Sequence, residues 1–365
     1  MATFDVLLPV KDGIAFLAES IESIIGQTYQ DWRLIVLDHG STDGSVELSN
    51  HYAERDARVI VRAFPNAVGL SGLLNCGLDL CDCKYVLRQD ADDVSMPDRM
   101  MVLSKTFDEN PSVVLLGSLG DVIDARGEKI GSIDMPTGPN GVAATILFRS
   151  PLCHPSVAMR FGALQSLGRV NGTKVRYGLD FLGAIPSARR MTVPGLAEDY
   201  FLFGQLALIA PCQNIPNKLI KYRWHGANVS TTKYLAQIQM ALEISRYLAE
   251  SLSILKNVPH FDPAPFCNHG ESLFNIHGKT DFSAEFAVLA QVLRDTISAS
   301  EELERELAFR KVISNRSILP MGLRFATFMR QHKTRPAESN TIRSWMLRSV
   351  KKQPVLKLEP SGVLS

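Results

Sequence analysis

The chain has 365 residues, of which 45% are hydrophobic, and a formal net charge of +1 at pH 7. This length leaves room for two or three domains, and the composition is normal for a globular protein. The six cysteines are sparse and irregularly spaced, which excludes a disulfide framework. No apolar run is long enough to span a membrane, and the first residues lack the pattern of a signal peptide, so we expect a cytoplasmic protein.

The first ninety residues alternate between strand and helix patterns. Strands are predicted over residues 4–10, 32–38, 58–64 and 84–90, with helical spacing of apolar residues between them. This order predicts an α/β fold with a mainly parallel sheet between helices. Ligands of such sheets bind beyond the carboxyl ends of the strands, where this chain has Asp12, Asp38, Asp90 and Asp92.

Glycine spacing argues against two common phosphate-binding folds. No strand runs into GxGxxG, and no GxxxxGK[ST] motif occurs, so neither a dinucleotide fold nor a phosphate loop is supported. The phosphates of a nucleotide would then have to be held in another way. A cation bound by carboxylates is the obvious one, and Asp90, Asp92 and Asp93 place three carboxylates within four positions.

The rest of the chain changes character twice. Residues 106–230 begin with a strand pattern at 112–118 and are then punctuated by Gly and Pro. From residue 233 onward the pattern is helical, over 234–255, 283–313 and 318–330. We therefore expect a first domain over 1–232, made of a nucleotide-binding half (1–105) and an acceptor half (106–232), and a helical, basic region over 233–365.

Seven segments, in this order, give the chain a resemblance to a known family: "LLPVKDG", "SIIGQTYQDWRLIVLDHGSTDGS", "GLSGLLNCGL", "LRQDADDVSMPDRM", "LCHPSVAMR", "AEDYFLF" and "IPNKLIKYRWHGANVS". The chain resembles the inverting glycosyltransferases of family 2, which have the GT-A fold and use nucleotide sugars. Bacterial surface-polysaccharide transferases are the most similar members. The resemblance implies transfer of a hexosyl or N-acetylhexosaminyl group from a nucleotide-diphosphate donor, with a UDP-sugar favoured, to a hydroxyl of a growing surface glycan such as O-antigen or capsule.

The resemblance also assigns the donor side of the site. Asp90 and Asp92 project to one side of an extended chain, which suits Mn²⁺ or Mg²⁺. Asp92 is implied as the firmest metal ligand, and Asp90 or Asp93 as a contact to ribose and metal-bound water. Asp93 has an alternative role as the N-cap of the next helix. Contacts to the donor nucleotide are implied for Pro9, Val10, Asp12, Asp38, Asp90 and Arg88. For Arg88 the alternative is an ion pair with a neighbouring aspartate.

Two positions depart from the family's pattern. His39 stands where a second acidic residue is common, and Asp12 stands where asparagine is usual. Either His39 turns away and Asp38 still serves the base, or the base is not uracil. The sequence leaves the nucleotide base open.

Catalysis requires a base that takes the proton of the acceptor hydroxyl. By resemblance "AEDY" supplies Asp199 as this base and Glu198 as a positioning group, with an N-cap role as the alternative. Arg223 and His225 are expected to contact the diphosphate or the acceptor, and His225 is a candidate for the metal shell. His154 is expected to line the acceptor pocket. An ordinary structural role is the alternative for both histidines.

Positive charge gathers near the carboxyl end of the chain. Between Arg310 and Lys357 there are twelve basic residues and one acidic residue, Glu338, with bulky apolar residues between them. This pattern suits an anionic membrane surface, and we expect Phe325, Phe328 and Trp345 to insert there. That would fit a lipid-linked acceptor on the inner face of the cell membrane. A solvated tail or a homodimer contact is the alternative, and no nucleic-acid-binding module accompanies the charge.

Two other functions compete with glycosyl transfer. A nucleotidyltransferase that makes sugar nucleotides has a similar α/β pattern, but "PVKDGIAF" does not supply its glycine-rich loop. A degenerate scaffold that only binds a partner would explain His39 and Asp12. The joint presence of Asp90, Asp92 and Asp199 argues against that hypothesis.

Overall fold

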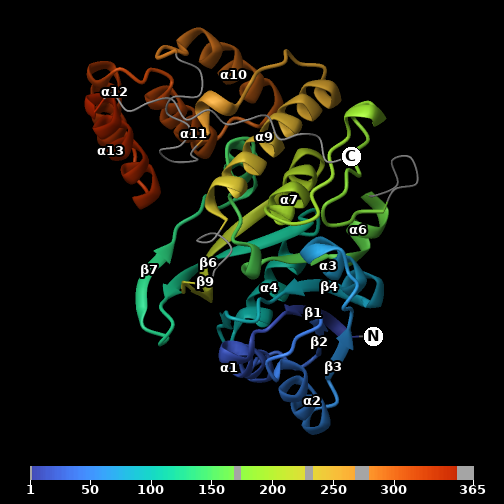
Figure 1. Ribbon diagram of the computed structural model, residues 1–365. Coiled ribbons are helices and arrows are strands. Elements are labelled where there is room, and N and C mark those ends of the chain that lie inside the picture. The colour runs from blue at the N-terminus through green and yellow to red at the C-terminus, as the bar shows by residue number, and fades with distance from the viewer. Residues whose placement is uncertain (1, 168–173, 227–232, 268–278, 352–365) are drawn as a thin grey trace. The chain divides into compact units, whose positions relative to one another are not determined.

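The computed structural model describes residues 2–167, 174–226, 233–267 and 279–351 (Figure 1). It contains two compact units: Met1–Pro139 with Leu152–Thr232, and Asn140–Pro151 with Lys233–Ser365. The chain thus leaves the first unit for a short segment and returns to it before residue 233. The functional division of residues 1–232 into two halves stays a prediction.

Within the described residues, the first unit holds one sheet of nine strands, in the order β3-β2-β1-β4-β8-β6-β9-β5, with β7 paired to β6. The neighbours β3, β2, β1 and β4 are parallel, as the alternating pattern predicts. The other half is mixed, because β8 and β5 run antiparallel to their neighbours. The strands are β1 (Ala2–Val10), β2 (Trp32–Asp38), β3 (Val59–Ala63), β4 (Cys83–Arg88), β5 (Val94–Ser95), β6 (Leu115–Ile123), β7 (Lys129–Ile133), β8 (Ala158–Arg160) and β9 (Cys212–Arg223).

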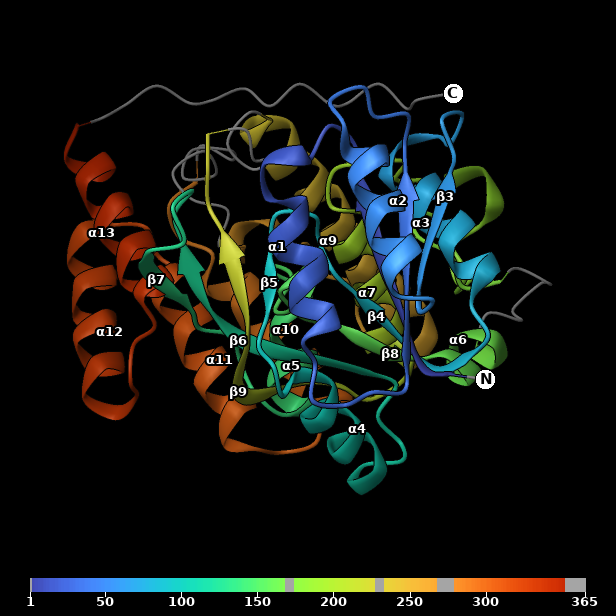
Figure 2. The same cartoon turned by 90° about the horizontal axis from the view of Figure 1, so that it is seen from below.

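Helices cover both faces of the parallel strands (Figures 1 and 2). On one face Leu17 and Ile21 pack into a core with Val6 and Leu34. On the other face a Cβ added to Gly77 would lie 2.6 Å from a methyl of Leu37, so only glycine lets this helix lie so close to the strand. Burial on both faces explains why these strands are continuous apolar runs. The helices are α1 (Ile14–Ile25), α2 (Ser45–Arg55), α3 (Gly69–Leu80), α4 (Arg99–Glu109), α6 (Phe161–Leu167) and α7 (Glu198–Ile209).

The parallel strands end at one edge of the sheet. Val10, the last residue of β1, pairs with Asp38, the last residue of β2. On the other side of β1, Leu7 pairs with Arg88, where β4 ends. The polar residues that follow these strands are therefore carried to one edge, as expected for a ligand site.

The second unit consists of helices, with the short α5 (Pro139–Thr145) at the point where the chain enters it. The helical pattern predicted over 283–313 corresponds to two helices in the structure, because one helix ends at Thr296 and the next begins at Glu301. A further helix follows residue 335, which the sequence pattern does not predict. None of the described helices is both long and apolar enough to cross a membrane. The helices are α9 (Tyr234–Lys256), α10 (Ser283–Thr296), α11 (Glu301–Ile313), α12 (Ile318–Gln331) and α13 (Pro336–Lys351).

Several of the basic and aromatic residues expected at a membrane lie in the core of this unit. Phe328 is 2% exposed and Trp345 is 0% exposed, so neither side chain is available for insertion. Arg310 is buried against Glu306, and Arg316 is buried with its guanidinium 5.3 Å from the ring of Trp345. The prediction that Phe328 and Trp345 insert is wrong, because both anchor the helices to one another.

Candidate active site

Three aspartates lie together in the turn after β4. Their carboxylate oxygens lie within 4.8 Å of one another. The side-chain amide of Gln89 holds the turn by donating to the Asp93 carbonyl at 2.8 Å, and Arg99 donates to Gln89 Oε1 at 3.0 Å. Asp90, Asp92 and Asp93 thus present oxygen ligands, the kind that Mg²⁺ and Mn²⁺ prefer.

Positive groups lie among these carboxylates. Arg88 Nε donates to Asp90 Oδ1 at 2.9 Å, and His154 Nε2 lies 2.5 Å from Asp90 Oδ2. Burial alone would raise the pKa of Asp90, but Arg88 and His154 outweigh it and hold that pKa below its usual value. Burial would likewise lower the pKa of His154, but Asp90 raises it to about 9, so the imidazole is protonated at neutral pH. The arginine and the histidine offset the repulsion between the crowded aspartates.

Asp92 is more exposed than Asp90. Its side chain is 32% exposed, compared with 17% for Asp90. Its Oδ2 lies 3.0 Å from His225 Nε2. Burial and the charge of Asp90 raise the pKa of Asp92. A nearby cation would favour the ionised carboxylate, so the position fits the predicted metal ligand.

Asp93 has the least favourable surroundings of the three. Its Oδ1 accepts the backbone N–H of Arg223 at 2.7 Å, but its buried Oδ2 has no hydrogen-bond partner among the described residues. Burial and the charges of Asp92 and Asp90 raise the pKa of Asp93 well above its usual value. The N-cap of α4 is Asp98, so Asp93 does not cap that helix, and this alternative is wrong.

Arg223 braces this turn from β9. It is buried, and its Nε donates to the Asp92 carbonyl at 2.8 Å and its Nη1 to the Asp124 carbonyl at 3.1 Å. Its Nη2 pairs with Glu19. The guanidinium also lies 4.7 Å from the centre of the Phe16 ring. The expected contact between Arg223 and a diphosphate stays a prediction, and the observed contacts are with the protein itself.

Glu198 and Asp199 begin α7 after two residues with unusual backbone geometry. The φ angle is 56° at Leu196 and 67° at Ala197, in the left-handed region that costs about 1–2 kcal/mol for a residue with a Cβ. Ala197 is the N-cap, so the alternative that either carboxylate caps the helix is wrong. Both carboxylates lie in the first turn, where the helix dipole favours negative charge.

Two side chains connect these carboxylates to the aspartate cluster. Arg88 Nη1 lies 3.3 Å from Glu198 Oε1, and His154 Nδ1 lies 3.6 Å from Asp199 Oδ2. Burial, with the charge of Asp199, raises the pKa of Glu198. Arg88 and His154 therefore each contact Asp90 on one side and a carboxylate of α7 on the other. The fold brings the predicted metal, donor and base residues into one network, and their chemical roles stay predictions.

The predicted nucleotide side lies at the ends of β1 and β2. Pro9 and Val10 are buried there, beside Asp38. The Asp38 carboxylate accepts the backbone N–H groups of Gly40 and Ser41 at 2.9 and 3.1 Å, which shapes the loop after β2.

The two departures from the family's pattern lie in the loops beside Asp38. Asp12 has a φ of 50°, and its Oδ1 accepts the backbone N–H of Thr42 at 2.8 Å. His39 Nε2 lies 2.9 Å from the carbonyl oxygen of Ala67. The His39 ring is thus engaged by the loop before α3, which leaves Asp38 as the acidic group at the end of β2.

Sequence reasoning missed Tyr177 and Glu19. Tyr177 is buried, and burial raises its pKa. The charge of Arg88 lowers this pKa, and acidic neighbours such as Glu198 raise it further. Glu19 pairs with Arg223 from helix α1. No local pattern marks either residue, because each meets the site through contacts between segments far apart in the chain.

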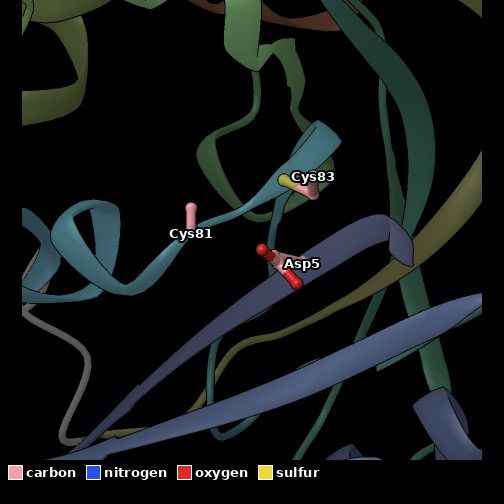
Figure 3. A group of neighbouring side chains, drawn as sticks. All are labelled: Asp5, Cys81 and Cys83. Atoms are coloured by element: carbon pink, nitrogen blue, oxygen red, sulfur yellow. The ribbon is translucent and has the colours of Figure 1, made fainter. Parts of the chain in front are cut away.

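A second group of neighbouring polar side chains is Asp5, Cys81 and Cys83 (Figure 3). It lies at the other end of β4, whose first residue is Cys83. Both carboxylate oxygens of Asp5 accept hydrogen bonds from Arg33, at 2.7 Å each. A hydrogen bond with Cys81, burial and the charge of Asp5 raise the pKa of the Cys83 thiol, which therefore stays protonated. The Asp5 carboxylate is paired with Arg33 and the Cys83 thiol is protonated, so packing and the ion pair explain this group without a metal ion.

Comparisons with known proteins point to one family. A family model described as glycosyl transferase family 2 matches residues 5–168, which include β1 to β4, the aspartate turn and His154. An uncharacterized glycosyltransferase of Haemophilus influenzae is 26% identical over 239 residues, covering 63% of this chain and 68% of that protein. The putative glycosyltransferase EpsE of Bacillus subtilis is 33% identical over 154 residues. That match covers 41% of this chain and about half of EpsE, 54%.

A solved structure extends the likeness of fold to nearly the whole chain. The crystal structure of S. aureus TarS 1–349 in complex with UDP-GlcNAc aligns with a TM-score of 0.56 at 14% identity, over 96% of this chain and 92% of that one. Identity this low shows the fold alone. The predicted GT-A α/β fold with carboxyl-terminal helices is confirmed, and residues 5–168 match the model of glycosyl transferase family 2.

Proposed function

We propose that the chain is a metal-dependent, inverting glycosyltransferase that moves a sugar from a nucleotide-diphosphate donor to a hydroxyl of a growing surface glycan. The observation that carries the proposal is the close approach of three carboxylates after β4, within 4.8 Å, joined through Arg88 and His154 to Glu198 and Asp199. Oxygen ligands for a cation and a candidate base for the acceptor hydroxyl thus lie in one network of contacts.

The residues present fit a divalent cation. Asp92 and Asp90 would hold it, and Oδ2 of Asp93, which is buried without a hydrogen-bond partner among the described residues, would be a further oxygen beside it. Burial, and after it the charges of the neighbouring aspartates, raise the pKa of Asp92 and Asp93, and a cation beside them would favour the ionised carboxylates. When bound, Mg²⁺ or Mn²⁺ would act as a Lewis acid toward the donor diphosphate.

Asp199 is proposed as the base, with Glu198 as the group that positions it. Asp199 is held near His154, and Glu198 is buried against Arg88. Asp199 would take the proton of the acceptor hydroxyl while its oxygen attacks the anomeric carbon from the side opposite the diphosphate. One such displacement inverts the anomeric centre and forms no covalent enzyme intermediate.

A UDP-sugar is the favoured donor. TarS, which shares the fold, was crystallised with UDP-GlcNAc. In this chain His39 is turned to the Ala67 carbonyl, so Asp38 is the acidic side chain left at the end of β2 for the base. The acceptor is proposed to be a glycan, free or lipid-linked, with a peripheral contact to the inner face of the cell membrane in the lipid-linked case.

Donor hydrolysis tests the proposal. The purified chain is incubated with a panel of UDP- and GDP-sugars in Mn²⁺, in Mg²⁺ and in chelator, and the released nucleoside diphosphate is quantified. We expect release with one class of donor, only with metal, and none from an Asp92→Asn preparation that serves as the contamination control. Equal release in chelator, or none with any donor at any metal, would refute the proposal.

A further inference from the structure

The carboxyl-terminal pair of helices exposes large apolar side chains. Leu319 is 71% exposed, Leu323 62% and Met329 51% on α12, and Leu347 is 54% exposed on α13. These helices lie side by side (Figures 1 and 2). We call the surface formed by these four side chains the α12–α13 outer face.

Helical spacing places Leu319 and Leu323 on the side of α12 that is opposite its buried residues. Leu319 and Leu323 are one turn apart, and Met321 and Phe328 point to the other side of α12, where they are buried. On α13, Leu347 is exposed while Trp345 is buried. Helix α12 thus has a second, exposed apolar side, to which α13 adds Leu347.

The exposed charges of the segment 311–347, which contains the outer face, have one sign. Glu338 is the only acidic residue within 311–347, and it is buried, with Arg305 at 2.7 Å and Arg335 at 3.5 Å. The exposed charges are positive, from Lys311, Arg330, Lys333 and Arg343.

We propose that the α12–α13 outer face binds the surface of an anionic lipid bilayer. Exposed leucines among cations, with no exposed acid in the segment 311–347 itself, match a layer that is apolar below and negative at its surface. The proposal specifies the peripheral membrane contact that is part of the proposed function. Binding to the bilayer does not depend on that function, but its purpose, bringing the enzyme to a lipid-linked acceptor, does. The proposal also changes which side chains enter the lipid: Leu319, Leu323 and Leu347 do so, and Phe328 and Trp345 do not.

A second copy of the chain fits this face less well. A symmetric dimer sets the same patch of each partner against the other, so the patch with Arg330, Lys333 and Arg343 would face an equally cationic patch. Like charges brought together oppose association, whereas anionic lipids neutralise them.

Co-sedimentation of the full chain with vesicles tests the proposal. Vesicles of phosphatidylcholine mixed with phosphatidylglycerol are compared with phosphatidylcholine alone, at low and high salt. The triple variant Arg330→Gln, Lys333→Gln, Arg343→Gln should bind the anionic vesicles roughly 100-fold more weakly at low salt, since each basic residue near such a surface contributes about fivefold. Leu319→Ser with Leu323→Ser should weaken binding by roughly tenfold or more at both salt concentrations, because their apolar area no longer leaves water.

Matched controls keep the result specific. Arg126→Gln with Lys105→Gln removes two cations of the first unit that are 84% and 76% exposed, and should leave binding unchanged. Unchanged thermal transitions show that each variant is folded. Asp92→Asn should abolish transfer without affecting vesicle binding, which separates this proposal from the catalytic one. Wild type that stays in the supernatant with anionic vesicles at low salt would overturn it. Leucine variants that bind the vesicles as wild type does would also overturn it. The same holds for leucine variants whose only change is the conversion of a dimer into a monomer.

Discussion

Asp90 and Asp92 are two positions apart in the sequence but have opposite electrostatic surroundings. Asp90 lies between Arg88 and His154, which lower its pKa despite burial. Asp92 has His225 beside it, yet burial and Asp90 raise its pKa. The carboxylate with the raised pKa gains most from a cation, so Asp92 should be the more sensitive of the two to loss of metal.

Asp92→Asn should therefore reduce transfer to background and greatly weaken metal-dependent donor binding. The change keeps the size of the side chain and removes its charge from the cation site. Asp98→Asn is the matched control, because Asp98 belongs to the same segment, is exposed and makes no cap hydrogen bond. Initial rates at saturating Mn²⁺ provide the measurement, and full activity of Asp92→Asn would exclude this carboxylate from the metal site.

Asp199→Asn should separate catalysis from binding. We expect turnover to fall by roughly 10²–10⁴-fold, the usual effect of losing a general base. Donor affinity should stay close to that of wild type, because Asp199 is held by His154 and not by the aspartate turn. Steady-state kinetics and calorimetric titration of the donor give the two values. A parallel loss of donor affinity would assign Asp199 to donor binding instead.

The sequence could predict the acidic residues of the site better than their partners. The spacing of Asp90, Asp92 and Asp93 directly after an apolar strand is visible without a structure. Tyr177 and Glu19 were not predictable, because they reach the site from a distant loop and from α1. Arg223 shows the opposite problem: its position near the carboxylates was expected, but its donors are directed to backbone carbonyls and to Glu19.

At the scale of elements, α11 carries a buried ion pair in the second unit. Glu306 and Arg310 lie one helical turn apart, are both buried and pair with each other. Burial would raise the pKa of Glu306, but Arg310 and Arg149 outweigh it and lower that pKa. Because the folded pKa lies below the unfolded value of about 4.5, the ionised pair stabilises the fold above that pH.

Glu306→Gln should thus destabilise the protein by about 3–5 kcal/mol at neutral pH, since it leaves a buried arginine charge uncompensated. The difference from wild type should shrink as the pH falls below the ordinary value of 4.5 and through the lower folded pKa. Denaturant unfolding at a series of pH values measures it. Glu302→Gln, at an exposed position of the same helix, is the control. A difference that does not change with pH would mean that the ion pair is not its source.

Elements with a strong repeating pattern were predictable, and short or variable ones were not. The apolar runs of β1, β2 and β4 are visible because most of their residues are buried on both faces, and β3 shows as a short run of Val and Ile although it is only partly buried. Strand β5 has two residues and β8 has three, too few to form a pattern, and both depend on pairing with distant strands. Helix α13 begins with a polar stretch over 336–341, so only its second half gives a helical apolar signal.

At the scale of the molecule, every residue of the candidate active site belongs to the first unit, and the α12–α13 outer face belongs to the second. The first unit carries the match to the family model, over residues 5–168. The division predicts that substitutions on the outer face change where the protein works and leave its chemistry with soluble acceptors unchanged.

Metal-dependent donor binding by the full chain tests the central claim most directly. Thermal unfolding is followed with UDP and UDP-sugars, in Mn²⁺ and in chelator, for wild type and Asp92→Asn. A ligand that binds only the folded state at about 100 times its Kd adds about 2.7 kcal/mol of stability. We predict that a UDP-sugar stabilises the wild type with Mn²⁺, and that this effect disappears in chelator and in Asp92→Asn. Equal stabilisation in all three conditions would contradict a metal–donor site at the aspartate turn.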